Sequence, residues 1–125
     1  MALSQGEIGK ARAHTLQGLR VAEEIGLERE ILNLLYDLAR VRVAEGEPER
    51  AVEFLGLVLG HPASYEGRMG GGRIRDSVQA LLADLETELP LQDYAMALER
   101  GNSRNVDEVV DEILSGERPS TENLA

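Results

Sequence analysis

The first two apolar stretches of the chain show different helical patterns. After Ala11, the residues expected to face a core fall on one stripe, as on a helix with a single buried side: Thr15, Leu19, Ala22 and Ile25. From Leu27 to Glu45, apolar residues instead surround most of the helical circumference: Ile31, Leu32, Leu34, Leu35, Leu38, Ala39, Val41, Val43 and Ala44. Because such a helix is buried on two sides, we expect neighbours on both flanks, as in a stacked solenoid.

Shorter helical patterns follow. Pro48 suits the first turn of a helix, and the next apolar positions give that helix one expected buried face: Leu55, Val58 and Leu59. A further apolar pattern continues from Ile74 to Leu89. Leucine, valine and alanine dominate these patterns, which favours close helix packing. The sequence therefore predicts an all-α fold.

Proline and glycine mark the ends of the last helices. Pro90 opens one helix, which we expect Gly101 to close. A polar break at residues 102–105 separates it from a short helix that begins at Val106 and stops at Gly116. The chain of 125 residues is long enough for one core and too short for two.

Two segments forty residues apart share a pattern. Residues 6–11 and 46–51 both begin with Gly-Glu and end with Ala, and apolar residues at helical spacing follow each of them. Repetition at such a period is typical of helical repeat proteins. We expect both segments to be turns that enter a helix.

The second segment belongs to a stretch that resembles a tetratricopeptide repeat. In order, the stretch contains Leu and a small residue within 35–40, the Gly-acidic turn, Ala51, and then the apolar set that ends at Leu59. The resemblance implies antiparallel helical hairpins, in which small residues such as Ala39 let the helices approach closely. The chain departs from the motif because it has no Trp, and because Arg42 stands where the family often has an aromatic residue.

Nearly the whole chain is similar to the C-terminal tetratricopeptide arrays of large bacterial regulators and signal-transduction ATPases. A His-Pro-Ala-Ser segment at 61–64 and a Leu-rich helix that ends in Glu-Leu-Pro at 88–90 carry this resemblance. It implies a protein-interaction module that belongs to a bacterial regulatory or signalling system.

We expect four segments within a single compact domain. The resemblance implies the repeat helices and the cap, whereas the glycine content and the polar last residues indicate a loop and a tail. Residues 1–60 are tetratricopeptide-like helices of a short α-solenoid, and 61–72 are a glycine-rich loop. Residues 73–116 are C-terminal capping helices, and 117–125 are a flexible tail.

Four residues of the central helix form the candidate partner-binding site. Asn33, Tyr36, Asp37 and Arg40 recur at three- and four-residue spacing and therefore share one face. By resemblance, this face lines the concave groove in which such repeats bind peptides. The alternative is a solvated face with one helical ion pair and a tyrosine packed on a neighbour.

The acidic composition narrows the classes of partner. A net charge of −10 repels nucleic-acid phosphates and anionic membrane surfaces, and no apolar stretch is long enough to span a membrane. The chain has no cysteine, and residues 1–8 lack the pattern of a signal peptide. We therefore expect a cytoplasmic protein that binds neither nucleic acid nor membrane.

Catalytic and metal-binding patterns are weak. His14 and His61 have no acid or nucleophile at a recognisable spacing, and the carboxylates within 107–112 are typical of a solvated helix face. We expect no enzymatic activity, no metal and no other cofactor. The sequence predicts a protein or peptide partner, and the alternative is a homodimer that buries the open face of the solenoid.

Overall fold

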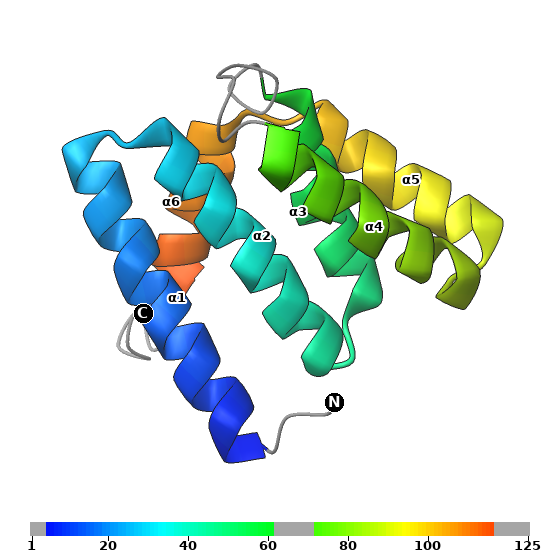
Figure 1. Cartoon of the computed structure of the whole chain (residues 1–125), viewed down its shortest axis with the longest axis horizontal. Helices are drawn as coiled ribbons and strands as arrows, with labels where there is room; N and C mark the ends of the chain where they lie inside the picture. The colour runs from blue at the N-terminus through cyan, green and yellow to red at the C-terminus, as the bar shows by residue number, and fades with distance from the viewer. Residues whose placement is uncertain (1–4, 62–71, 117–125) are drawn as a thin grey trace, which may run out of the picture.

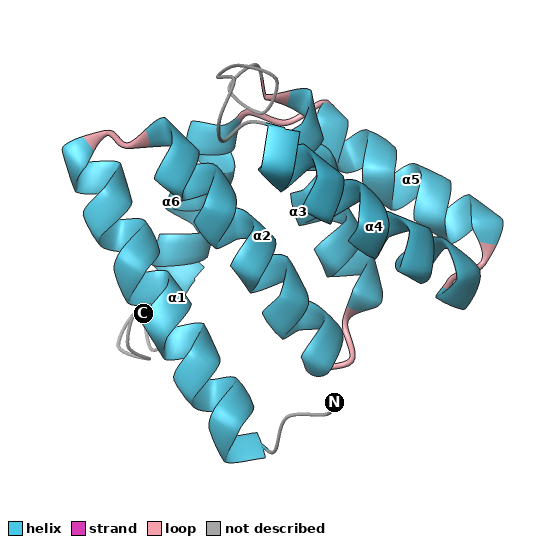
Figure 2. Ribbon diagram, in the orientation of Figure 1, coloured by secondary structure: helices cyan, strands magenta, loops and turns pink. Residues whose placement is uncertain are grey.

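The computed structural model describes residues 5–61 and 72–116, and these residues fold into α-helices joined by short turns (Figures 1 and 2). No strand occurs among them, which confirms the all-α prediction. The helices are α1 (Gln5–Ile25), α2 (Glu28–Ala44), α3 (Pro48–Gly60), α4 (Gly72–Glu88), α5 (Leu91–Asn102) and α6 (Val106–Gly116).

The helices pack around α2 and α3. In Figure 1, α2 runs antiparallel to α1 and α3 runs antiparallel to α2, and α6 lies behind α1 and α2. The most extensive packing joins α3 to α5, whereas α4 lies mainly on α3 and touches α2 and α5 only slightly. The expected loop at 61–72 and the expected tail at 117–125 lie mostly outside the described residues, although Gly72 already belongs to α4.

Glycines with positive φ end the first two helices. Gly26 has φ of 83° and Gly46 has φ of 82°, a conformation that an L side chain rarely adopts. Beside Gly46, the N–H of Glu47 donates to the carbonyl of Arg42 over 2.8 Å, as in a Schellman cap. Gly46 therefore forms the predicted turn into α3.

The matching turn predicted at residues 6–11 is wrong, because α1 already begins at Gln5. The three residues Gly6, Glu7 and Ile8 lie inside a helix of 21 residues. Gly6 has ordinary helical backbone rather than positive φ, so the repeated Gly-Glu pair has a different conformation at each site.

Burial of α2 on two sides is confirmed. Its buried residues are Ile31, Leu32, Leu34, Leu35, Leu38, Ala39 and Val41, and the helix packs on α1, α3 and α4. The stripe predicted for α1 is buried at Thr15, Leu19 and Ala22. Ile25 is the exception, with 64% of its surface exposed, because it ends α1 at the turn.

The prediction of one buried face for α3 is wrong, because α5 covers a second side. Phe54 and Leu57 are buried in addition to Leu55 and Val58. A Cβ on Gly56 would lie 2.7 Å from the carbonyl oxygen of Leu98, so the α5 backbone reaches α3 at this point.

Gly101 has a different role from the predicted one. The residue is buried inside α5, which ends one residue later, and Ser103 occupies the cap position. A Cβ on Gly101 would lie 2.1 Å from the carbonyl oxygen of Glu53 in α3. Gly101 therefore allows two helices to cross closely, and the crossing places α3 at the centre of the core.

Candidate functional site

The face of α2 predicted to bind a partner is largely exposed. Asn33, Asp37 and Arg40 are exposed along one side of the helix. Tyr36 is half-buried and packs against the core. The structure thus brings three of the four residues together at the surface and gives the fourth a packing role.

The charges around Asp37 come from two helices. Partial burial raises the pKa of its carboxyl above the ordinary value, and the charge of Glu30 raises it further. The charges of Arg40 and His14 act in the opposite direction. Since His14 belongs to α1, residues of both helices determine the electrostatics of this face.

A groove of about 400 Å³ lies between α1 and the start of α2. We call it the α1–α2 groove, and its lining residues are His14, Gln17, Gly18, Val21, Ala22, Leu27 and Glu30. Its floor is closely packed, because a Cβ on Gly18 would lie 3.2 Å from a methyl carbon of Leu34. Glu30 lies one helical turn before Asn33, so the groove continues into the exposed face of α2.

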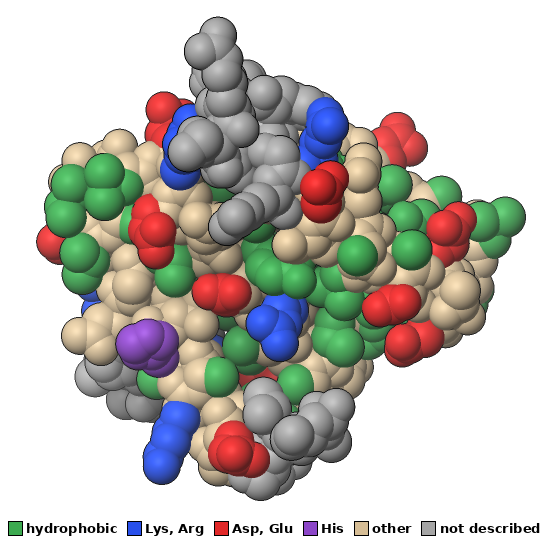
Figure 3. All heavy atoms as spheres, in the orientation of Figure 1, with side chains coloured by type: hydrophobic (Ala, Val, Ile, Leu, Met, Phe, Trp, Pro, Cys, Tyr) green, Lys and Arg blue, Asp and Glu red, His purple; other side chains and the backbone are tan. Residues whose placement is uncertain are grey.

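Three large apolar side chains are exposed where α1 turns into α2. The exposed fraction is 48% for Val21, 64% for Ile25 and 49% for Leu27. Figure 3 shows hydrophobic side chains gathered at this corner of the molecule. Val21 and Leu27 line the groove, so an apolar surface and a concave surface coincide here.

The histidines and the acidic helix face provide no metal site among the residues that the structure describes. No three His, Asp or Glu side chains in 5–61 and 72–116 are placed to hold a metal ion. His14 is exposed, and Nε2 of His61 lies 3.2 Å from a carboxylate oxygen of Glu28. Within these same ranges, every helix is too short or too polar to cross a bilayer.

Acidic side chains meet where α6 approaches α1. Burial raises the pKa of Glu23 on α1, and a hydrogen bond with Asp111 on α6 raises it further. The negative charges of Asp111, Asp107 and Glu24 act in the same direction. This contact is therefore least favourable when the carboxyls are ionised.

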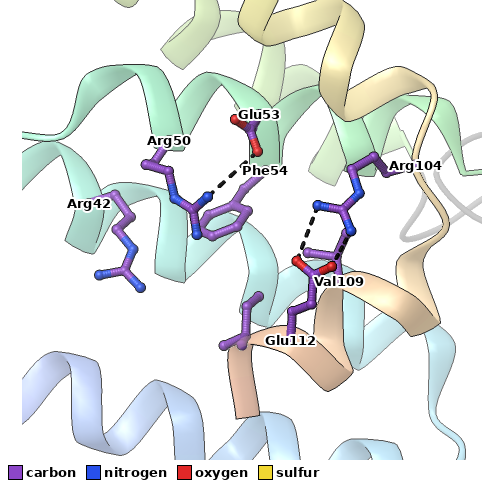
Figure 4. A pocket seen from close by; sticks show the side chains of 8 residues that line it. Arg42, Arg50, Glu53, Phe54, Arg104, Val109 and Glu112 are labelled. Carbon is purple, nitrogen blue, oxygen red and sulfur yellow. Dashed lines mark hydrogen bonds and ion pairs between the residues drawn. The ribbon is translucent and has the colours of Figure 1, made fainter. Parts of the chain in front are cut away.

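A second pocket, which the sequence analysis did not predict, contains three arginines. It has a volume of about 210 Å³ and lies between the end of α2, α3 and α6 (Figure 4). Arg42 comes from α2, Arg50 from α3, and Arg104 from the turn before α6. We call it the arginine pocket. Its other lining residues are Glu53, Phe54, Val109, Glu112 and Ile113.

The first two arginines of the pocket are held differently. Arg42 is deeply placed, with 13% of its side chain exposed, and its Nη1 donates to Glu45 over 2.7 Å. Its Nε is buried and has no hydrogen-bond partner among the described residues. The Arg50 guanidinium lies 5.5 Å from the centre of the Phe54 ring, as a cation–π contact requires, and is half-exposed.

Arg104 is paired with a carboxylate at the edge of the pocket. Its two terminal nitrogens donate to the two carboxylate oxygens of Glu112 (Figure 4). This pair raises the pKa of Arg104 and lowers the pKa of Glu112. Glu53, the other acidic residue of the lining, accepts a hydrogen bond from Nε of Arg100 at 3.0 Å.

The arginine pocket could not be predicted from the sequence, because its arginines are far apart in the chain. Arg42 is eight residues from Arg50, on another helix, and Arg104 is more than fifty residues further on. One signal was present: an arginine at position 42, where the resembled motif has an aromatic residue, lies within a helix predicted to be buried on two sides.

Comparisons with known proteins do not add a family to these observations. No protein-family model matches the chain, and neither does any curated protein or solved structure.

Proposed function

We propose that the chain is a non-catalytic protein-interaction module of the tetratricopeptide type, which binds a peptide segment of a partner protein in the α1–α2 groove. The exposure of Val21, Ile25 and Leu27 beside this groove carries the proposal. Contiguous exposed apolar side chains with polar neighbours are typical of interaction sites. Burial of these side chains by a partner supplies the main driving force.

The charges of the groove favour a partner segment with basic residues. Glu30 is the one charged lining residue apart from the titratable His14, and Asp37 lies close enough for Glu30 to raise its pKa. Among the residues that the structure describes, neither Lys nor Arg lines the groove. The net charge of −10 also attracts a basic partner over longer distances. We therefore expect apolar side chains flanked by Lys or Arg in the bound segment.

The exposed face of α2 extends this site. The Asn33 side chain is exposed and offers both donors and an acceptor to the backbone of a peptide. Arg40 provides a cation at the far end, one turn beyond Asp37. A bound segment that runs from the groove along α2 thus meets apolar, acidic and basic groups in turn.

Self-association through the same surface is the second candidate. Its support is that Val21, Ile25 and Leu27 form one patch, which can face its own copy across a two-fold axis. The two candidates differ in their dependence on chain concentration. Light scattering over a range of concentrations distinguishes them, because only a homodimer changes mass on dilution.

A peptide-library selection tests the proposed function. The natural chain is expected to select peptides with apolar residues next to Lys or Arg. A double substitution of Glu30→Lys and Asp37→Lys reverses the local charge and is expected to select acidic flanks instead. Val21→Asp is expected to abolish binding, whereas Leu91→Asp, at a residue 74% exposed on α5, serves as the matched control.

Two results contradict the proposal. One is selection of the same peptides by the natural chain and the charge-reversed chain. The other is equal binding by the Val21→Asp and Leu91→Asp variants when circular dichroism shows that both are folded. The homodimer is favoured instead if the molar mass of the natural chain falls on dilution while that of the Val21→Asp variant stays constant.

A further inference from the structure

The arginine pocket concentrates positive charge in an acidic chain. The chain has 13 Lys and Arg against 23 Asp and Glu, yet three arginines line one small pocket. Structural ion pairs account for only part of this. Arg104 is paired with Glu112 and Arg42 with Glu45, whereas Arg50 reaches Glu53 only at 3.8 Å. Arg42 retains a buried Nε without a partner among the described residues.

We propose that this pocket binds a carboxylate carried on a short aliphatic group. Guanidinium groups bind planar carboxylates through paired hydrogen bonds, and two of the three arginines have donors left for such a ligand. Arg50 gains a closer partner than Glu53. The unpartnered Nε of Arg42 is buried, so a bound carboxylate reaches it only after a small movement of the Arg42 side chain. The site is independent of the α1–α2 groove and of the function proposed for it.

The lining selects a singly charged ligand. Arg42 pairs with Glu45, Arg104 with Glu112 and Arg100 with Glu53, so Arg50 is the one lining arginine whose positive charge is left for the ligand. A phosphate, which carries between one and two negative charges at neutral pH, meets more repulsion from these acidic residues than a carboxylate does. A carboxylate is therefore the better match.

The walls and the size of the pocket select the rest of the ligand. Phe54, Val109 and Ile113 form the apolar part of the lining beside the guanidinium groups, each with less than a tenth of its surface exposed. A volume of about 210 Å³ is below the usual range for drug-sized ligands. An isobutyl group with its carboxylate has the right size and polarity, either as a free acid or as the C-terminal residue of a peptide.

Arg40 offers a matched control for Arg42. The two residues are two positions apart on α2 and therefore point about 200° apart around the helix axis. Arg40 lies on the exposed face beside Asp37, whereas Arg42 lines the pocket. Substitution of either residue removes the same charge from the same helix, and only one change affects the pocket.

Nuclear magnetic resonance titration of the arginine Nε–H signals tests the proposal on the whole chain. N-acetyl-leucine, a mimic of a C-terminal leucine, and isovalerate, a free short acid, are expected to shift the Arg42 signal in a saturable manner. N-acetyl-leucinamide lacks the carboxylate and is expected to cause no such shift. The probe that binds more tightly identifies the natural source of the carboxylate.

Substitutions sharpen the test because they act in opposite directions. Arg42→Gln and Arg50→Gln are each expected to weaken binding about fivefold or more, through loss of a charged hydrogen bond. Arg42→Gln removes the Arg42–Glu45 pair and can unfold the chain. Arg50 is half-exposed, so Arg50→Gln leaves the fold intact and keeps the test valid. Glu112→Gln frees Arg104 and is expected to strengthen binding, whereas Arg40→Gln leaves it unchanged.

Three results overturn the proposal: equal binding of N-acetyl-leucine and its amide, no saturable shift with either acid, or unchanged affinity in a folded Arg50→Gln variant. Tighter binding of inorganic phosphate than of both acids also overturns the choice of a carboxylate. None of these results bears on the α1–α2 groove, whose variants lie on α1 and on the opposite side of α2.

Discussion

The crossing of α3 and α5 depends on glycine, and Gly101→Ala tests this dependence. A Cβ at position 101 would lie 2.1 Å from the carbonyl oxygen of Glu53 and 2.9 Å from the backbone nitrogen of Leu57. Both atoms belong to the α3 backbone, so no side-chain rotation relieves the overlap. The two helices must separate by roughly 1 Å to restore an ordinary contact distance.

Two opposing effects set the size of the change. Overpacking in a core destabilises by about 1–3 kcal/mol, and more where backbone must move. Alanine is favoured over glycine within a helix by about 1 kcal/mol, which offsets part of that loss. Because separation also loosens the packing around Gly56 at the same interface, we expect Gly101→Ala to lower the free energy of unfolding by about 2 kcal/mol.

Urea unfolding followed by circular dichroism measures this change. The expected loss lowers the unfolding midpoint by about 1 M, since the dependence on urea is about 1–3 kcal/mol per molar for small proteins. Gly9→Ala is the control, because nothing lies within 4 Å of a Cβ at that position of α1. It is expected to stabilise by about 0.5–1 kcal/mol. A Gly101→Ala variant at least as stable as the natural chain would refute the close crossing.

Three other changes test local features. Glu23→Gln is expected to stabilise at neutral pH by about 0.5 kcal/mol, the scale of a surface charge pair, with Glu99→Gln as a control that changes little. The pKa of Glu23 is raised in the fold, so protonation of Glu23 stabilises the native state. The extra stability of the Glu23→Gln variant must therefore vanish below the ordinary pKa of 4.5, where Glu23 is protonated in both states. Urea unfolding at several pH values checks this. Asn105→Ala removes the side-chain oxygen that accepts the Asp107 N–H over 2.8 Å and is expected to lower the unfolding free energy by about 1 kcal/mol, whereas Asn105→Asp retains it. Gly46→Ala, which forces positive φ on alanine, is expected to lower the thermal midpoint, and an unchanged midpoint would contradict the cap at the end of α2.

Local signals in the sequence predicted most of the helices. The periodic apolar residues placed α2 between neighbours, and Pro48 and Pro90 marked the starts of α3 and α5. Gly46 was interpretable because a helix cap involves only adjacent residues. These features depend on contacts within a few residues, which a single sequence contains in full.

Glycines that serve a distant contact were not interpretable in this way. A glycine near the end of an apolar pattern, such as Gly101, predicts the end of a helix. In the structure, Gly101 instead lets the backbone of α3 pack closely against α5. For the same reason, the pattern of α3 predicted one buried face, since the second is covered by α5, more than thirty residues later in the chain. At Gly6 a turn was predicted but a helix is found. The sequence does not exclude this, because a helix can include an exposed glycine at a cost of about 1 kcal/mol.

The two candidate sites show the same division between local and distant information. Asn33, Tyr36, Asp37 and Arg40 were predicted from helical spacing within one helix and from the resemblance, and three of them are exposed on one side of α2. Arg42 interrupts the buried side, where Glu45 pairs with it at 2.7 Å, and its place in a pocket depends on the distant Arg50 and Arg104. Because the core fixes the rotation of α2 about its axis, Arg40 is held at the surface and Arg42 in the pocket. The packing that stabilises α2 thus also determines that Arg40 faces the proposed peptide and Arg42 the proposed carboxylate.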